Sequence, residues 1–275
     1  MILPCRPCLF AGPDDTTWPR ISFLIRFTNV TKEFRDPGGG AIVAVRDLSL
    51  TVVQGETVCL IGPSGCGKTT TMRLVNRLIE PSRGTITVDD GDIREQDPIA
   101  LRRSIGYVIQ SGGLFPHLTV ARNVGLLCEV EGWAADRTEQ RVAELLELVN
   151  LPAAEFAARR PGELSGGQRQ RVGVARALAL DPAIILMDEP FGALDPITRD
   201  QLHDEFAALE ARVKKTILLV THDMREAFKL GDRIALMDRG EIVQIGSAAD
   251  FRTRPASPFV ETFLRSHLGE TGHAG

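Results

Sequence analysis

The segment from Thr57 to Thr71 limits the possible folds more than any other part of the chain. It begins with an apolar run, Val58 to Ile61, of the kind that forms a fully buried strand. A glycine-rich turn and a helix-compatible segment follow directly, with the pattern G-x-x-x-x-G-K-T. Strand, loop and helix in this order predict a phosphate-binding loop in an α/β fold. The loop residues are Gly62, Pro63, Ser64, Gly65, Cys66, Gly67, Lys68 and Thr69.

The residue types in this loop match the chemistry of phosphate binding. Its three glycines allow positive φ angles and a close approach of backbone amides to phosphate oxygens. Lys68 supplies a positive charge for the β- and γ-phosphates, and Thr69 supplies a hydroxyl for Mg²⁺. A helix predicted from Thr69 to about Ile79 directs its positive end at the same anion. The loop therefore predicts a site for a nucleotide with Mg²⁺.

The composition fits one globular domain, with room for a subdomain. The chain has 275 residues, of which 43% are hydrophobic and 25% charged. Its formal net charge of −4 gives no basic excess that would indicate nucleic acid. No apolar run approaches the roughly 18 residues of a membrane span, so a role at a membrane would need a partner. The five cysteines follow no disulfide framework, which favours a reducing cytosol.

Residues 1–20 are predicted to be an irregular, disordered tail, because four prolines interrupt any helix there. Cys5 and Cys8 have the C-x-x-C spacing. A zinc or redox site would need a second pair or a surrounding fold, so we assign no function to them.

Alternating and apolar runs predict two kinds of strand in the remainder. Residues 25–30 and 43–53 alternate on either side of a glycine-rich turn and predict an antiparallel hairpin. Residues 105–109, 183–187 and 216–221 predict buried strands, and a polar residue follows each of them. Ligands of open α/β sheets bind at the carboxyl ends of the strands. The residues expected there are Gln110, Asp188, Glu189 and His222.

Two of these residues have an expected chemical role from their position alone. Asp188 ends a strand in the way that the second acidic element of phosphate-loop proteins does, and is expected to hold Mg²⁺. Glu189 follows it, and a carboxylate there can orient and polarise an attacking water.

A second glycine-rich segment precedes another predicted helix, which extends to about Leu180. Its residues are Ser165, Gly166, Gly167 and Gln168, and Ser165 is a good candidate for the helix N-cap. The two glycines would also let the backbone meet an anion at the start of the helix. Alone, this pattern is a weak signal and favours a plain helix cap. Beside a phosphate-binding loop, it suggests that two copies of the chain share nucleotides between them.

The assembled motifs resemble those of ATP-binding cassette (ABC) proteins. The shared set is GPSGCGKTT, Gln110, LSGGQ, IILMDEP, ALD and His222, in this order, over roughly residues 25–245. The resemblance implies an α/β fold with a P-loop NTPase core, an antiparallel β subdomain and an inserted helical subdomain. We expect the domain to span residues 21–260, with the helical subdomain over about 115–163 and a C-terminal tail over 261–275.

The resemblance also implies site residues, with ATP as the nucleotide and Mg²⁺ as the metal. Phe34 is expected to stack on adenine, and the loop from Gly62 to Thr70 to hold the phosphates. The implied metal ligands are Thr69, Gln110 and Asp188. The implied catalytic residues are Lys68, Gln110, Glu189 and His222. Ser165 to Gln168 are expected to contact the nucleotide of a second copy, and Asp195 to lie at the interface between the copies.

A narrower resemblance concerns cassette subunits of bacterial importers for glycine betaine, choline and carnitine. It rests on stretches such as DPIALRRSIGYVIQSGGLFPHLTV and THDMREAFKLGDRIALM. It implies integral membrane permease subunits as partners, an extracellular solute-binding protein as an indirect partner, no nucleic acid, and a peripheral location on the cytoplasmic face of the inner membrane. An importer for methionine, another amino acid or phosphonate is the alternative, as is a soluble cassette outside transport. A regulatory cassette without hydrolysis would lack Lys68, Glu189 or His222, and all three are present.

Overall fold

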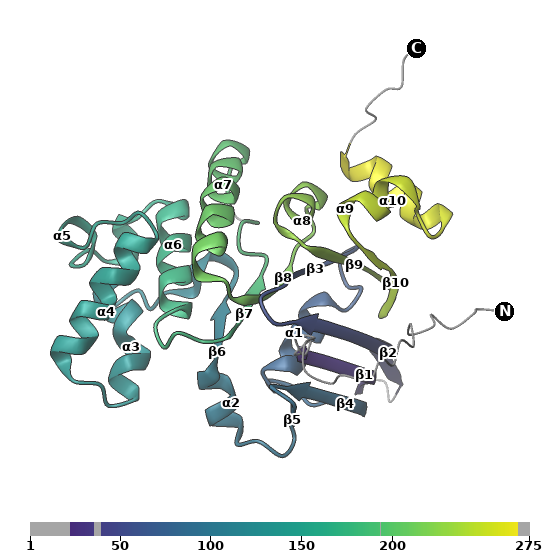
Figure 1. Ribbon diagram of the computed structural model, residues 1–275, viewed down its shortest axis with the longest axis horizontal. Helices are drawn as coiled ribbons and strands as arrows, with labels where there is room; N and C mark the ends of the chain where they lie inside the picture. Colours follow the sequence, from purple (N-terminus) through teal and green to yellow (C-terminus); the bar gives the residue numbers. More distant parts are fainter. Residues whose placement is uncertain (1–22, 36–39, 193, 269–275) are drawn as a thin grey trace, which may run out of the picture.

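A six-stranded sheet carries the hydrophobic core on both of its faces (Figure 1). The computed structural model describes residues 23–35, 40–192 and 194–268. The strand order is β10-β9-β3-β8-β7-β6, with all neighbours parallel except β10, which is antiparallel to β9. The strands are β3 (Thr57–Ile61), β6 (Ile105–Val108), β7 (Ile184–Asp188), β8 (Thr216–Val220), β9 (Arg233–Asp238) and β10 (Glu241–Gly246).

A second, antiparallel sheet has the order β2-β1-β4-β5. Its strands are β1 (Phe23–Arg35), β2 (Ala41–Val53), β4 (Arg83–Val88) and β5 (Gly91–Asp92). The predicted hairpin is therefore confirmed, with both strands longer than expected. Strand β4 begins at Arg83, which pairs with Thr31 in the ladder between β4 and β1.

The helices group by position along the chain. Between β3 and β6 lie α1 (Lys68–Val75) and α2 (Pro98–Ser104). Between β6 and β7 lie the 3₁₀-helices η1 (Gln110–Gly113) and η2 (Pro161–Glu163), with α3 (Val120–Val130), α4 (Ala135–Leu148), α5 (Ala153–Phe156) and α6 (Gly166–Ala177). The last helices are α7 (Pro196–Val213), α8 (Met224–Leu230), α9 (Ala248–Thr253) and α10 (Pro258–Leu268). Figure 1 shows α3, α4 and α5 gathered at one end of the molecule, away from the antiparallel sheet. The predicted helical insertion is thus present.

Alternation along β3 shows how the sheet separates the two parts of the core. Val58 and Leu60 pack with the antiparallel sheet and α1, whereas Cys59 and Ile61 pack with the helices between β6 and the C-terminus. A parallel sheet covered on both faces requires apolar residues at every position, which is why these strands are continuous apolar runs.

Helix α1 is shorter than predicted. It ends at Val75 instead of near Ile79, because Arg77 has a positive φ of 51° and the amides of Leu78 and Ile79 donate to the carbonyl of Arg73. This closing turn satisfies a carbonyl at the helix end.

The C-terminal boundary predicted at residue 261 is contradicted by α10, which continues to Leu268. Val260 and Phe263 of this helix are buried in the same cluster as Phe251 of α9. The helix therefore belongs to the folded domain as far as Leu268. The predicted tail over residues 1–20, with Cys5 and Cys8, lies outside the described residues.

We predict that Phe263→Ala lowers the free energy of unfolding by about 3 kcal/mol or more, because it removes a buried aromatic side chain from the core. Phe259→Ala, one turn earlier on the same helix, serves as the control and should cost less than about 1 kcal/mol. The exposed fractions are 7% for Phe263 and 36% for Phe259. Urea unfolding measures both, and equal losses would show that α10 does not pack as described.

Candidate functional site

Parallel pairing brings the predicted polar residues to one edge of the sheet. Strands β3, β8, β7 and β6 are neighbours in this order and run in the same direction. The phosphate-binding loop follows β3, His222 follows β8, Glu189 follows β7, and Gln110 follows β6. Four segments far apart in the sequence thus converge at the carboxyl ends of adjacent strands, where ligands of such sheets bind.

A cavity of about 230 Å³ opens beside the phosphate-binding loop. Its lining combines backbone amides, a cation, hydroxyls and a carboxylate. The lining residues are Ala44, Ser64, Gly65, Gly67, Lys68, Thr69, Thr70 and Glu189. The antiparallel sheet therefore contributes to this site through Ala44 of β2.

Two glycines of the loop are required by its conformation. Gly62 has φ +145° and Gly67 has φ +109°, which are angles that favour glycine. A side chain at Gly62 would meet the carbonyl oxygen of Met237 at 2.2 Å, and one at Gly67 would meet that of Ala44 at 2.3 Å. The backbone of the loop therefore packs directly against β2 and β9.

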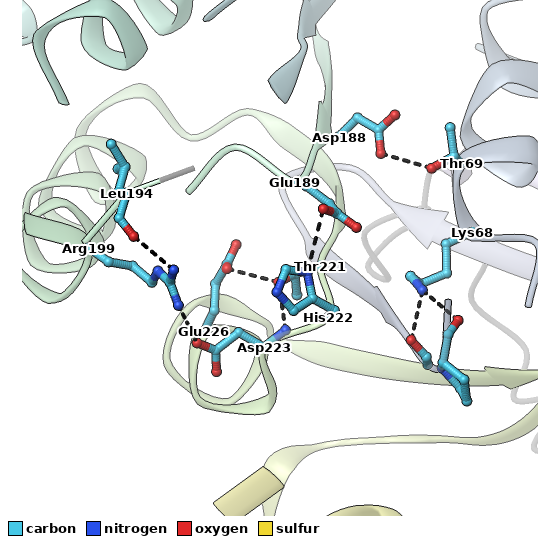
Figure 2. A network of polar contacts seen from close by, with 12 residues as sticks. Lys68, Thr69, Asp188, Glu189, Leu194, Arg199, Thr221, His222, Asp223 and Glu226 are labelled. Atoms are coloured by element: carbon cyan, nitrogen blue, oxygen red, sulfur yellow. Dashed lines mark hydrogen bonds and ion pairs between the residues drawn. The ribbon is translucent and has the colours of Figure 1, made fainter. Parts of the chain in front are cut away.

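Lys68, at the start of α1, holds a buried ammonium group. Its Nζ donates to the carbonyls of Gly62 at 2.7 Å and Pro63 at 3.0 Å (Figure 2). Burial raises the pKa of the nearby Cys66 thiol, and Lys68 partly offsets this. The loop thus presents a fixed cation beside a mostly uncharged thiol.

Thr69 and Asp188 meet across the site. The Thr69 hydroxyl donates to Oδ1 of Asp188 at 3.1 Å. Burial raises the pKa of the Asp188 carboxyl, and the hydrogen bond from Thr69 opposes this. A hydroxyl beside a half-buried carboxylate gives oxygen ligands of the kind that hard divalent cations take.

Glu189 and His222 face one another beside this pair (Figure 2). Glu189 Oε2 lies 3.5 Å from His222 Nδ1. Glu189 has a positive φ of 46°, and its amide donates to the carbonyl of Val220 at 2.9 Å. This bond to β8 holds an unusual backbone conformation, and such conformations concentrate at functional sites.

Gln110 begins η1, and its side chain borders the same space as the carboxylate of Glu189. Both Gln110 Nε2 and Glu189 Oε2 lie 3.5 Å from the place that a side chain at Gly192 would occupy. The glycine leaves space for the two groups to approach the same point.

Phe34 lies on β1 near the hairpin end and is exposed, with the Lys32 ammonium 4.9 Å from its ring centre. It pairs with Ile42 of β2, two residues from Ala44 of the cavity wall. The ring thus lies on the strand pair that borders the phosphate-binding loop.

Ser165 caps α6, as predicted. Its Oγ accepts from the amide of Gln168 at 3.2 Å, and Gln168 Oε1 accepts from the amide of Ser165 at 2.8 Å. Side chains added at Gly166 and Gly167 would meet Leu194 and Thr198 at about 3 Å. We call the segment from Ser165 to Gln168 the signature turn. It packs on the loop that contains Asp195 in its own chain. None of its four residues is among the described residues that line the cavity at Lys68.

Asp195 caps α7 through a bond from the amide of Thr198 at 3.0 Å, which lowers the pKa of its carboxyl. Its side chain is at the surface.

Comparison with known proteins identifies the architecture. The family model for ABC transporters matches residues 45–192, which contain the phosphate-binding loop, the signature turn and Glu189. The chain belongs to the ABC transporter family. An ABC domain binds ATP, and the cavity at Lys68 is the place in this chain that has the corresponding loop.

Several curated relatives of this ABC cassette are named for transport of carnitine, choline or osmoprotectants. The carnitine transport ATP-binding protein OpuCA of Listeria monocytogenes is 54% identical over 88% of this chain and 59% of its own length. The choline transport ATP-binding protein OpuBA of Bacillus subtilis is 52% identical over 88% and 62%. The osmoprotectant import ATP-binding protein OsmV of Salmonella typhimurium is 47% identical over 88% and 63%. The chain thus spans about six-tenths of the length of these relatives.

A solved structure similar to this ABC cassette is a dimer. It is the post-hydrolysis state of the ATP-binding cassette MJ0796 bound to ADP and Pi, with a TM-score of 0.72 and 35% sequence identity. The similarity covers 81% of this chain and 98% of that one. None of the helices described for this cassette has the length and apolarity needed to cross a membrane.

Sequence reasoning missed the polar network beneath His222. It consists of Leu194, Arg199, His203, Thr221, Asp223 and Glu226 (Figure 2 shows all but His203). One signal was available: Glu226 lies four residues before Leu230 on the buried face of α8, where an acid is unusual.

We predict that Ser165→Ala lowers the free energy of unfolding by about 1 kcal/mol, because the amide of Gln168 loses its acceptor. Ser165→Asp should keep the stability of the wild type, since an aspartate is an equally good cap and favours the positive helix end. Urea unfolding measures both. A Ser165→Ala protein as stable as the wild type would show that the cap does not stabilise α6. Because Ser165→Asp keeps the cap but lacks the hydroxyl, comparing the two variants separates the effect of the cap from any contact of the hydroxyl with nucleotide.

Proposed function

We propose that two copies of this chain bind MgATP between them and hydrolyse it. The observation that carries the proposal is the position of Glu189 and His222. They lie 3.5 Å apart at the strand ends beside the phosphate-binding loop, and Glu189 lines its cavity. The signature turn of the same chain lies outside this cavity, which supports a site completed by a second copy.

The residues of each copy have separable roles in this proposal. Lys68 and the loop amides bind the β- and γ-phosphates, and Phe34 stacks on the adenine. Glu189 orients and polarises the attacking water, and His222 holds the γ-phosphate and that water. The transferred phosphoryl group passes through a loose transition state, whose negative charge Lys68 and the glycine amides of the partner's signature turn stabilise. Asp195 lies between the copies.

The metal ligands proposed are Thr69, Asp188 and Gln110. The contact between the Thr69 hydroxyl and Asp188 fits Mg²⁺, which takes few protein ligands and fills its other positions with phosphate oxygens and water. When bound, Mg²⁺ neutralises charge on the phosphates.

Glu189→Gln is expected to reduce ATP turnover by about a hundredfold or more, because an amide cannot act as a base toward water. It should leave nucleotide binding intact, so that ATP converts the variant from monomer to dimer in size-exclusion chromatography. The control is Lys68→Ala combined with Glu189→Gln, which should remain monomeric with ATP because the phosphates lose their cation. Hydrolysis by Glu189→Gln at the wild-type rate would exclude the proposed role of Glu189.

The transported solute proposed is a quaternary amine such as glycine betaine, choline or carnitine. Support comes from the relatives named for carnitine, choline and osmoprotectant transport, which match 88% of this chain. The cassette would lie on the cytoplasmic face of the inner membrane, bound to permease subunits, with an extracellular solute-binding protein that delivers the solute. Import of methionine, another amino acid or phosphonate is the second candidate. Binding of each solute to the cognate solute-binding protein decides between them.

The contact with the permease is proposed at the loop after η1. Phe115 is 43% exposed in this loop, and Leu114 is beside it. An exposed aromatic side chain in a loop next to Gln110 suits an interface that senses the nucleotide.

Phe115→Asp is predicted to uncouple transport from hydrolysis, because a charge would be desolvated at the permease contact. ATP binding by the isolated cassette should stay unchanged. Ile245→Asp is the matched control: Ile245 is 39% exposed on β10, at the opposite edge of the sheet from β6. Solute uptake in proteoliposomes measures both, and uptake by Phe115→Asp equal to that of Ile245→Asp would exclude this contact.

A further inference from the structure

The turn that carries His222 is closed by the side chain before it. The Thr221 hydroxyl accepts from the amide of Asp223 at 3.0 Å, which folds the backbone around His222. The same hydroxyl donates to Oε2 of Glu226 at 2.9 Å. Glu226 of α8 thus holds the hydroxyl that closes the turn (Figure 2).

Glu226 is deeply buried, with only 2% of its surface exposed. Its Oε2 lies 3.8 Å from His203 Nε2. Among the described residues, neither Oε1 of Glu226 nor Nε2 of His203 has a hydrogen-bond partner. The ring of His203 packs edge-on against buried Phe191 at 4.9 Å between centres. A carboxylate that accepts a single hydrogen bond in such a place would be strongly destabilised by loss of water.

The charged and titratable groups that act on Glu226, or on which it acts, come from several elements of the fold. They are Arg199 and His203 of α7, Asp223 before α8, Glu189 after β7, and Cys59 of β3. The guanidinium of Arg199 makes its hydrogen bond and ion pair with groups other than Glu226. It donates to the carbonyl of Leu194 at 2.9 Å and pairs with Asp223 at 3.5 Å.

The surroundings favour an uncharged pair. Burial raises the pKa of the Glu226 carboxyl to about 8, against the lowering effect of the Thr221 hydrogen bond. Burial also lowers the pKa of His203. Near neutral pH, both groups are therefore without charge.

We propose that Glu226 is a positioning residue for His222, and that it acts in its uncharged form by holding the Thr221 hydroxyl that closes the turn. This inference rests on the proposed ATP hydrolysis. When Glu226 loses its proton, a buried negative charge arises next to the turn and draws the Thr221 hydroxyl and the Arg199 guanidinium toward itself. His222 then leaves its position opposite Glu189, and turnover falls.

The decisive variant is Glu226→Gln, which keeps an acceptor for Thr221 and a donor in the place of the acid proton but cannot ionise. At pH 7 its turnover should stay within about twofold of the wild type. Between about pH 7 and about pH 9, wild-type turnover should fall about tenfold more than that of Glu226→Gln, because only the wild type ionises in this range. Thr221→Val, which removes the hydroxyl, should lose about tenfold at pH 7, and Thr221→Ser should restore most of it.

Glu210→Gln is the matched control. Glu210 is also a shielded glutamate with a raised pKa that accepts from a threonine hydroxyl, that of Thr57. Glu210 belongs to α7 and meets Thr57 at the amino end of β3, whereas His222 follows the carboxyl end of the neighbouring strand β8. Its pH profile should match that of the wild type.

Stability gives a readout that does not depend on hydrolysis. The unfolded carboxyl loses its proton near pH 4.5, whereas the folded one keeps it to about pH 8. The contribution of this group to the free energy of unfolding is thus complete below pH 4.5 and is lost as the pH rises through about 8. Measured by urea unfolding, wild-type stability should decline relative to Glu226→Gln across this range and level off above it.

The outcomes separate the two proposals. A wild type without ATP turnover overturns the proposed function, and the stability difference still tests the charge of Glu226. A wild type that is active, with pH profiles of turnover and stability parallel to those of Glu226→Gln, overturns the positioning role. So does a Glu226→Gln protein that is as inactive as Thr221→Val, because this would mean that the carboxylate charge is needed.

Discussion

The parallel hydrogen bonding of β3, β8, β7 and β6 is the constraint on which the site depends. In a parallel sheet the carboxyl ends of all strands lie at one edge, so any residue that directly follows a strand also lies at this edge. Lys68, His222, Glu189 and Gln110 come from segments separated by up to about 150 residues. To bring them together, it is enough that four short strands pair in the correct register. Each of these strands is buried on both faces and is therefore firmly held.

Much of this arrangement could be predicted from sequence because the signals are local. A continuous apolar run followed by one polar residue marks a strand end, and the positive φ angles at Gly62, Gly65 and Gly67 follow from the loop motif. Boundaries were less predictable, since they depend on distant partners. Helix α1 stops early through a turn onto Arg73, and α10 is ordered because Val260 and Phe263 reach the core beside Phe251.

The acid on the buried face of α8 was a signal for the network below His222, but the contacts within the network could not be predicted, because no local pattern pairs Thr221 with Glu226 and His203. Their proximity depends on how α7 and α8 pack over the sheet, which periodicity does not fix. The environment also reverses the usual expectation for an acid: a glutamate that would be a solvated charge on an exposed helix becomes an uncharged hydrogen-bonding group in the core.

The same packing links the two halves of the proposed nucleotide site within one chain. Gly166 and Gly167 of the signature turn lie against Leu194 and Thr198, and Arg199 of α7 binds the Leu194 carbonyl with one nitrogen and Asp223 with another. The signature turn is thus joined, through the loop of Asp195 and Arg199, to the turn that carries His222. Packed side chains and charged hydrogen bonds make every step of this connection. Within one chain, the turn proposed to meet a partner's nucleotide is therefore connected by direct contacts to the histidine proposed to act on the chain's own nucleotide.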